Sequence, residues 1–449
     1  MLGRLRARIR EILGNRDASE LIRGGGTNLL VYATGRVIGV AYVVAIARHY
    51  GAEGYGAFAL SLTCLVIASV FGRCGLSVAL LRLVAQYAST NRIGVVRDIF
   101  RKAVCLATAS AVLIAGAFYW SSPVIAQELF GQVGLERDLR IMALALVPHV
   151  WVQLLAESLR GLKKILLYSL LIDVLPFAFG LFAFYGLKTW STWDAIPAVS
   201  YLFGMAGTSV VGCIAWFRAS GVLAVPSDTS VSAREILTLA IPLLFGTSMV
   251  LLMNWTDNIM LGVFRSEDEV GVYDVAFRIA ILAGAILQAV NSIAAPKFAE
   301  CFASGDYTGL RHIAVSSTRV MFWVTAPIVI VCGALPGLIL SLFGDQFIVA
   351  STAFMILLIG TLINAASGSV GFILRMTGKE RIFQNILFAA TVINISLNAW
   401  LIPTHGINGA AVASVTSLAF WNLTSVYYVK RLYGFYTIYF PGLGRILRD

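Results

Sequence analysis

Charged residues are scarce in this 449-residue chain, at 13% of the sequence, whereas a soluble domain carries about 25%. Apolar residues make up 59%, and the mean hydropathy is +0.83. They gather in block after block of about twenty residues or more, the length of a membrane-spanning helix. A soluble enzyme is therefore excluded. The strands of about ten alternating residues that a membrane β-barrel needs are also lacking, so the sequence predicts an all-α polytopic membrane protein.

Motifs for metal, redox and nucleotide chemistry are lacking as well. The six cysteines stand singly, without metal or redox spacing, which predicts buried free thiols. A phosphate-binding loop is excluded because Gly378-Lys379 is followed by Glu380, where that motif needs Ser or Thr. The longest connection between apolar blocks, 297–319, has 23 residues and leaves no room for an ATPase domain. We therefore expect no cofactor and an energy source in the membrane potential or in an H⁺ or Na⁺ gradient.

The apolar blocks predict twelve helices in two sets of six. Residues 218–235 are rich in Ser, Pro and Gly and predict a cytoplasmic linker between an N-terminal lobe (25–217) and a C-terminal lobe (236–430). Residues 1–24 form a basic N-terminal segment and 431–449 a basic tail. The predicted spans are 25–48, 56–80, 100–120, 141–159, 165–187, 194–217, 236–263, 273–296, 320–343, 349–374, 382–402 and 407–429.

The basic residues orient these spans. The net charge is +11, and 26 of the 34 Lys and Arg residues lie in the termini and in the connections after even-numbered helices. The connections after odd-numbered helices hold five. Because cytoplasmic segments carry the excess of positive charge, both termini are predicted in the cytoplasm. The charge therefore matches a bilayer surface, and we expect no nucleic-acid partner.

An internal repeat supports the division into two lobes. At an offset of 215 residues, Gly56 aligns with Gly271, Arg82 with Lys297, and Arg160 with Arg375. Each repeat carries six helices and so begins and ends on the same side, which predicts parallel repeats about an axis along the membrane normal. Transporters of that design bind substrate between the halves and expose the site alternately to each side.

Five stretches then resemble a known family in sequence order. They are ARHYGAEGYGAFALSL at 47–62, DNIMLGVFRSEDEVGVYDVAFRIA at 257–280, AAPKFAE at 294–300, LRMTGKERI at 374–382 and HGINGAAVAS at 405–414. The set resembles the Wzx-type polysaccharide transport proteins, in the same superfamily as lipid II flippases and MATE exporters. The resemblance implies two six-helix lobes around a central cavity.

The same resemblance implies a function. It implies that undecaprenyl-diphosphate-linked oligosaccharide is moved from the cytoplasmic to the periplasmic leaflet of a bacterial inner membrane for surface polysaccharide assembly. A polysaccharide polymerase or chain-length regulator would then be a further partner.

A carrier of a diphosphate-linked glycolipid needs positive charge within the membrane. Arg36 lies eleven residues into the first predicted helix, about 16 Å along its axis, and Asn28, Tyr32 and Arg36 recur every four residues. These residues predict a polar cavity face on which Arg36 binds the diphosphate bidentately. The alternative is that Arg36 forms a structural bridge with a buried acid.

Two more arginines, Arg73 and Arg278, fall within predicted spans. Arg73 is interpreted either as a charge at the cavity entrance or as part of the basic cytoplasmic rim. Arg278 follows Asp274 by four residues, which favours an intrahelical ion pair. In lipid II flippases, cavity arginines come from helices 1, 2 and 8, and the resemblance implies a diphosphate-binding role for Arg36, Arg73 and Arg278.

Intramembrane acids are the candidates for coupling. Asp257 and Asp173 are predicted to act as counter-ions to a cavity arginine or to carry a coupling proton. A pair of Glu157 with Arg160 is expected at a solvated end. His149 is interpreted as a packing residue rather than a proton relay.

Two other functions compete with the flippase hypothesis. A multidrug exporter of the MATE kind shares the twelve-helix layout, but it binds cations and would favour acids as the dominant cavity charge. A membrane-embedded glycosyl polymerase would need a sizeable periplasmic loop with a convergent catalytic site. The longest such loop, 121–140, has few charges and no such site.

Overall fold

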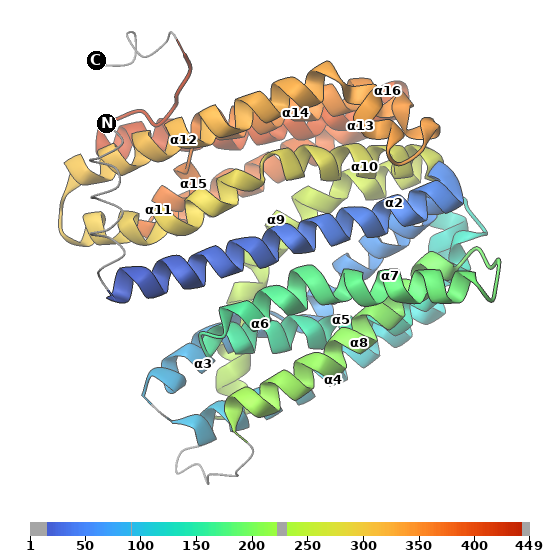
Figure 1. Cartoon of the computed structure of the whole chain (residues 1–449), viewed down its shortest axis with the longest axis horizontal. Coiled ribbons are helices and arrows are strands. Elements are labelled where there is room, and N and C mark those ends of the chain that lie inside the picture. Colours follow the sequence, from blue (N-terminus) through green and yellow to red (C-terminus); the bar gives the residue numbers. More distant parts are fainter. Residues whose placement is uncertain (1–15, 91, 222–230, 442–449) are drawn as a thin grey trace. The chain divides into compact units, whose positions relative to one another are not determined.

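A computed structural model of the chain describes residues 16–90, 92–221 and 231–441, and the regular secondary structure of this part is all helical, without strands (Figure 1). The N-terminal elements are α2 (Arg16–Arg73), α3 (Leu76–Ser89), α4 (Ile93–Val124), η1 (Ile125–Leu129), α5 (Leu135–Gly161), α6 (Ile165–Ser169), η2 (Leu170–Val174), α7 (Leu175–Lys188) and α8 (Ile196–Ser220). The C-terminal elements are α9 (Ala233–Phe264), α10 (Glu267–Ala283), α11 (Ala285–Ala303), α12 (Tyr307–Ala334), α13 (Pro336–Ser341), η3 (Asp345–Ala350), α14 (Ser351–Ser367), α15 (Val370–Met376) and α16 (Glu380–Tyr433).

Eight helices among the described residues are long and apolar enough to cross a membrane, or nine if the bent pair α10 and α11 is one span. Two of these are too long for one crossing. Leu30–Arg73 has 44 residues and Glu380–Tyr433 has 54, about 66 and 81 Å at 1.5 Å per residue, against a hydrocarbon core of about 30 Å.

Both long helices contain one glycine with non-helical backbone, Gly51 (φ 69°) and Gly406 (φ 53°). Only glycine adopts such a backbone readily, so each long helix consists of two spans joined at its glycine. With the bent pair and the 32-residue α9, the helices are consistent with the twelve predicted spans.

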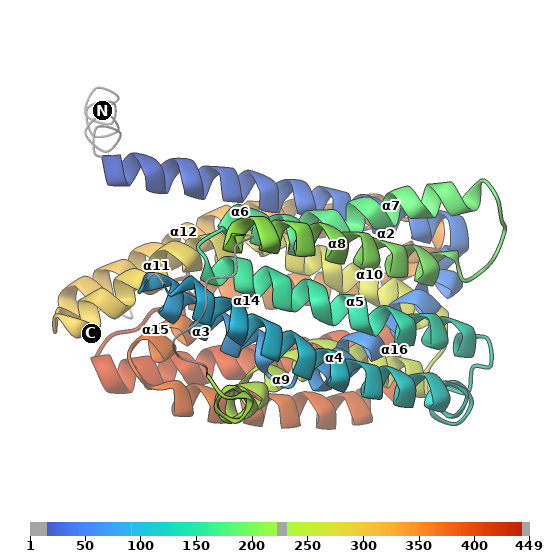
Figure 2. The ribbon, with the colours of Figure 1, turned by 90° about the horizontal axis from the view of Figure 1, so that it is seen from below.

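One compact unit is formed from the described residues of 1–42, 71–115 and 144–241. Within it α7 lies along α8, as Figures 1 and 2 both show. A Cβ atom on Gly204 of α8 would lie 2.5 Å from the carbonyl oxygen of Pro176 and 3.1 Å from the amide nitrogen of Gly180, both in α7. Small residues let membrane helices approach this closely, so the two backbones pack directly.

The second unit comprises 43–70, 116–143 and the described residues of 242–449. Its most telling contact joins the repeat-related residues Gly56 and Gly271. A Cβ on Gly56 would lie 1.7 Å from the carbonyl oxygen of Glu267, and a Cβ on Gly271 would lie 2.3 Å from that of Ala52. Residues 52 and 267 are separated by the same 215-residue offset, so the two contacts are equivalent under the internal repeat. A reciprocal contact of this kind is expected at a two-fold axis and supports the internal repeat.

The predicted all-α membrane fold is confirmed, and every predicted span overlaps an observed helix. The lobe boundaries stay a prediction, because the two compact units combine other segments of the chain than the predicted lobes do. Residues 1–15, 222–230 and 442–449 also lie outside the described part. The six cysteines are free, as predicted, but Cys105 is exposed and the others are half-buried. The prediction of buried thiols is therefore wrong, since apolar helix faces that meet lipid also carry cysteine.

Candidate functional site

Arg36 and Asp173 lie together in the first unit. A Cβ on Gly35 would lie 2.6 Å from the carbonyl oxygen of Asp173, so α2 touches η2 at this level. The neighbouring Arg36 and Asp173 side chains interact electrostatically. The contact exists because Gly35 has no side chain, and it places one acid beside the arginine predicted nearest the middle of the membrane.

The backbone at Asp173 is a π-helix, η2. Pro176, two residues after η2, has no amide hydrogen for the carbonyl four residues back, and its ring crowds that carbonyl. Widening the turn to a π-helix relieves this conflict. The π-helix thus lies where Pro176 interrupts the helical hydrogen bonds, and π-bulges are frequent at functional sites.

The Arg36 guanidinium is exposed and lies over the Tyr32 ring, 4.7 Å from its centroid. This guanidinium donates no hydrogen bond to any of the described residues. Stacking on a ring face leaves the in-plane N–H donors available. Tyr32 and Arg36 therefore share one face of α2. The cavity role predicted for this face stays a prediction, and the side chain of Asn28 lies outside the described residues.

Arg73 lies near Glu157 and His149 in the same unit and interacts electrostatically with both. Glu157 also pairs with Arg160, 3.5 Å from carboxylate oxygen to guanidinium nitrogen, as predicted. His149 is buried, and its Nδ1 lies 3.0 Å from the hydroxyl of Tyr201. This hydrogen bond is what a packing histidine would form.

Asp257 in the second unit is buried and accepts hydrogen bonds from four neutral side chains. The Tyr273 hydroxyl donates at 2.6 Å, and the amides of Asn398 and Asn394 donate at 2.7 and 3.3 Å. Ser414 is the fourth donor. The side-chain oxygen of Asn398 is buried without a partner among the described residues. The carboxylate is thus held by α10 and by both halves of α16.

Arg278 forms an ion pair with Asp274. The Nε of Arg278 donates to the buried carboxylate of Asp274 at 2.5 Å. The same carboxylate accepts from the hydroxyl of Tyr55 at 2.5 Å and from the amide of Asn258 at 2.9 Å. The intrahelical pair predicted from the four-residue spacing is therefore present. Tyr55 precedes Gly56, so this buried cluster lies beside the reciprocal glycine contact.

The counter-ion interpretation of Asp257 does not match these contacts. In the described part of the chain, Asp257 has neutral hydrogen-bond partners and Arg278 pairs with Asp274 instead. The physical reason is the helical spacing, which brings Asp274 within reach of Arg278 on one face of α10. The partner residues Asn394 and Asn398 were not singled out from the sequence. Their signal was two amides four residues apart in an apolar span, since polar side chains within the membrane are rare.

Comparison with known families matches most of the chain. A family model described as "Polysaccharide biosynthesis protein" matches residues 21–302, and one described as "MatE" matches residues 242–400. The "Putative O-antigen transporter" of Shigella flexneri is 21% identical over 415 residues, 88% of this chain and 94% of that protein. The "Probable low-salt glycan biosynthesis flippase Agl15" of Haloferax volcanii is 24% identical over 181 residues, which is 39% of this chain and only 38% of that protein.

Solved structures share the fold. An inward-facing multidrug resistance MATE family transporter of the MOP superfamily superposes with a TM-score of 0.74 at 14% identity, covering 91% of this chain and 98% of that one. The lipid II flippase MurJ in an inward closed conformation gives a TM-score of 0.71 at 12% identity, covering 90% and 87%.

Proposed function

Because the chain belongs to the polysaccharide biosynthesis protein family, a Wzx-type branch of the superfamily that holds flippases and MATE exporters, we propose that it flips a lipid-linked oligosaccharide. The substrate is an oligosaccharide on undecaprenyl diphosphate, moved from the cytoplasmic to the periplasmic leaflet of a bacterial inner membrane. Both termini face the cytoplasm. The product supplies surface polysaccharide assembly, where a polysaccharide polymerase or chain-length regulator receives it.

The observation that carries this proposal is the state of Arg36. A diphosphate cannot cross hydrocarbon without a cation to pair with, and the guanidinium of Arg36 keeps its donors free among the described residues. Asp173 is close enough to balance its charge when no substrate is bound. The arrangement favours a site that exchanges a protein carboxylate for a substrate phosphate.

Arg73 is the second phosphate-binding residue in this proposal. It lies on the cytoplasmic side of Arg36 in the predicted topology, with Glu157 as its counter-charge. Arg278 ranks last, since Asp274 already occupies its Nε donor.

Alternating access requires the contact at Gly56 and Gly271 to separate. Both residues lie near the helix ends predicted to be periplasmic, and Gly56 packs directly against the backbone of α10. In this proposal, the outward-open state parts these two helices and the inward state holds them together.

The energy comes from the membrane potential. A diphosphate with about two negative charges gains on the order of 4–5 kcal/mol from moving outward through 100 mV, at about 2.3 kcal/mol per charge. Coupling through Asp257 is a further part of the proposal. A buried carboxylate beside the unpartnered oxygen of Asn398 suits a proton or a small cation such as Na⁺.

The test is replacement of Arg36 by Ala in the purified protein in liposomes, with flipping of a fluorescent polyprenyl-diphosphate sugar as the readout. Flipping should fall at least about tenfold, since a charge-assisted hydrogen bond contributes roughly 1.5–3 kcal/mol. Arg101→Ala is the matched control, because Arg101 is 77% exposed and pairs with Asp98 near the end of α4 predicted to be cytoplasmic. Equal flipping by Arg36→Ala and Arg101→Ala would contradict the proposal.

The MatE match over 242–400 keeps a small-molecule exporter as the second candidate. An exporter should lower the accumulation of cationic dyes in cells, and it should do so without Arg36. A strain that loses dye export in Asp257→Asn but not in Arg36→Ala would favour that function. A membrane-embedded polymerase has no comparable observation in its favour.

A further inference from the structure

A basic pocket of about 580 Å³ lies in the second unit, between the first half of α12 and the chain that follows α16. Pockets of this volume fall within the range of small-ligand sites, about 300–1,000 Å³. Its basic lining residues are Arg311, His312, Arg319 and Lys430, and no acid lines it. None of the proposed transport residues contributes to it.

One face of α12 provides the first wall. Arg311, Val315 and Arg319 recur every four residues, and Thr308, His312 and Ser316 form the row beside them, which is the spacing of neighbours on a helix face. The start of this helix is capped by Asp306, whose carboxylate accepts from the Gly309 amide at 2.8 Å and from the Thr308 hydroxyl at 2.7 Å. These hydrogen bonds lower the pKa of Asp306.

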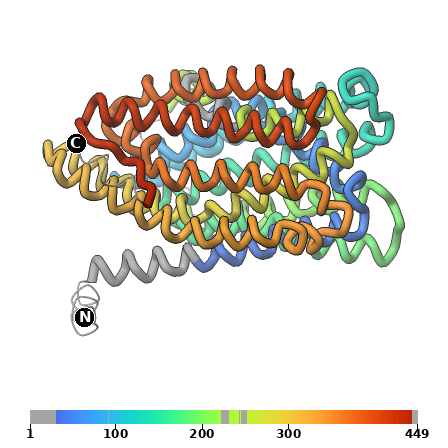
Figure 3. The backbone as a smooth tube through the Cα atoms, turned by 90° about the horizontal axis from the view of Figure 1, so that it is seen from above, coloured from blue at the N-terminus to red at the C-terminus, as the bar shows by residue number. Residues whose placement is uncertain are grey.

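The chain after α16 provides the second wall. It leaves the helix at Gly434, whose φ is +80°, and runs beside α12 (Figures 1 and 3). Phe435 is buried in the core, and the Tyr439 amide donates to the carbonyl of Ala366 at 2.8 Å. The Tyr439 hydroxyl accepts from the indole of Trp323 at 3.0 Å. The wall is therefore fixed at both ends.

Two basic side chains of the pocket contact aromatic rings. The Arg319 guanidinium lies 5.6 Å from the Tyr439 ring centroid, and the Lys430 ammonium lies 4.5 Å from that of Tyr436. Among the described residues no ion pair is present for Arg311, Arg319 or Lys430. Contact with a ring face orients a cation and leaves N–H donors for a ligand. The pocket therefore suits a phosphate.

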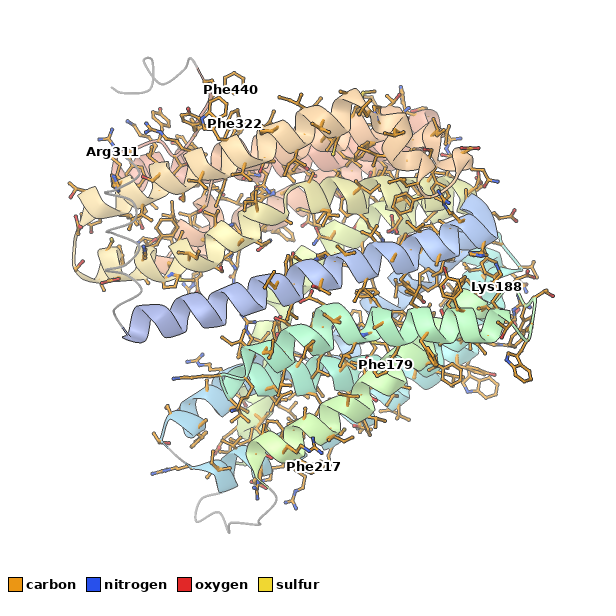
Figure 4. All side chains as sticks on the ribbon, in the orientation of Figure 1. Phe179, Lys188, Phe217, Arg311, Phe322 and Phe440 are labelled. Carbon is orange, nitrogen blue, oxygen red and sulfur yellow. The ribbon has the colours of Figure 1, made fainter. Side chains whose placement is uncertain are left out.

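The surroundings indicate that the phosphate belongs to a lipid. The row that contains His312 and Ser316 continues along α12 into Val320, Val324 and Ile328, which are all exposed. Figure 4 shows Arg311 near the start of α12 and Phe322 further along that helix, with Phe440 of the following chain beside Phe322. Basic, aromatic and apolar side chains thus follow one another, as in segments that enter a bilayer from its surface. A free anion would not contact the exposed apolar side chains that follow the basic ones on α12.

We propose that this pocket binds the phosphate headgroup of an anionic phospholipid of the cytoplasmic leaflet, with its acyl chains along Val320, Val324 and Ile328. Basic pockets at the cytoplasmic ends of membrane helices recognise such headgroups. The site is separate from the transported substrate and holds whether or not the chain flips oligosaccharides.

The test is native mass spectrometry of the purified full chain with phosphatidylglycerol and with phosphatidylcholine of the same acyl length. Phosphatidylglycerol should bind at least about tenfold more tightly, and the double variant Arg311→Gln/Arg319→Gln should lose that preference. The double variant Arg381→Gln/Arg431→Gln is the matched control, because both arginines are exposed near cytoplasmic helix ends and neither lines the pocket.

Three outcomes would overturn the proposal. The first is an equal loss of preference in the control pair, which would indicate general surface attraction. The second is full displacement of phosphatidylglycerol by millimolar inorganic pyrophosphate, which would indicate a site for free anions. The third is binding of farnesyl diphosphate but not of phosphatidylglycerol, which would indicate a substrate site. If the pocket double variant does not fold, Lys430→Gln alone should still weaken phosphatidylglycerol binding, and unchanged binding there would reject the proposal.

Discussion

Replacing Gly56 by Ala tests the reciprocal contact between the repeat-related helices. The new Cβ would lie 1.7 Å from the carbonyl oxygen of Glu267, and ordinary van der Waals contact begins at 3.4 Å. The atom in its path belongs to backbone, so no side chain can rotate away. The two helices must therefore separate by a further 1.7 Å or so, counted from those two distances.

The expected cost is that of overpacking a well-packed core, about 1–3 kcal/mol. Alanine recovers about 0.5–1 kcal/mol in a helix through its lower backbone entropy, so the net loss should be up to about 2.5 kcal/mol by these figures. Gly271→Ala should behave alike, since its Cβ would lie 2.3 Å from the carbonyl oxygen of Ala52. The double variant should cost less than the sum of the two, because one separation relieves both clashes.

The measurement is equilibrium unfolding of the purified protein in mixed micelles of SDS and a mild detergent, followed by circular dichroism. Gly116→Ala in α4 is the matched control, because nothing lies within 4 Å of its added Cβ. That variant should be about 0.5–1 kcal/mol more stable than the wild type. If Gly56→Ala shows the same gain as Gly116→Ala, or if the double variant costs the full sum, the reciprocal packing is wrong.

Three further predictions concern transport and topology. Arg36→Lys should restore only part of the flipping lost in Arg36→Ala, because an ammonium cannot form the bidentate contact; full restoration in the liposome assay would contradict a bidentate role. Flipping should respond to a potassium–valinomycin potential without a pH gradient, and a protein that ignores the potential but follows an imposed pH gradient, and loses it in Asp257→Asn, would support proton driving instead. A reporter fused after Lys430 should be cytoplasmic and one between Phe264 and Gly271 periplasmic, and an active periplasmic reporter at the C-terminus would overturn the twelve-helix topology.

Hydropathy located the helices of this chain because transfer of apolar blocks into a bilayer dominates all other terms. It did not locate their ends or breaks. α4 extends over Ile93–Val124 where 100–120 was predicted, since a helix continues through polar flanks that hydropathy excludes. The turn at Cys74 and Gly75, with φ of 46° and 73°, has no hydropathy signal either. The π-helix before Pro176 has a local sequence signal, because proline removes a specific hydrogen bond.

The candidate site was predictable where its partners lie on one helix. The four-residue spacing identified the pair of Asp274 with Arg278, and it placed Tyr32 beside Arg36. Partners on different helices could not be predicted from spacing along the sequence. Asp173 meets Arg36 because a π-helix in one span and a glycine in another bring the two backbones together. Gly35 precedes Arg36 in the sequence, but the helix that it meets cannot be read from that sequence.

The charges within the spans therefore fall into two kinds, and the difference lies in what their hydrogen-bonding groups already contact. Asp274 accepts from Tyr55, Asn258 and Arg278, so a ligand at Arg278 would have to compete with an ion pair whose carboxylate is buried. Breaking such a pair leaves an uncompensated buried charge, which costs about 3–5 kcal/mol. Arg36 has no such bond among the described residues, so a phosphate can bind its donors without displacing a hydrogen-bonded carboxylate. The Nε donor occupied by Asp274 favours a structural role for Arg278, and the available donors of Arg36 are the physical reason to propose substrate binding there.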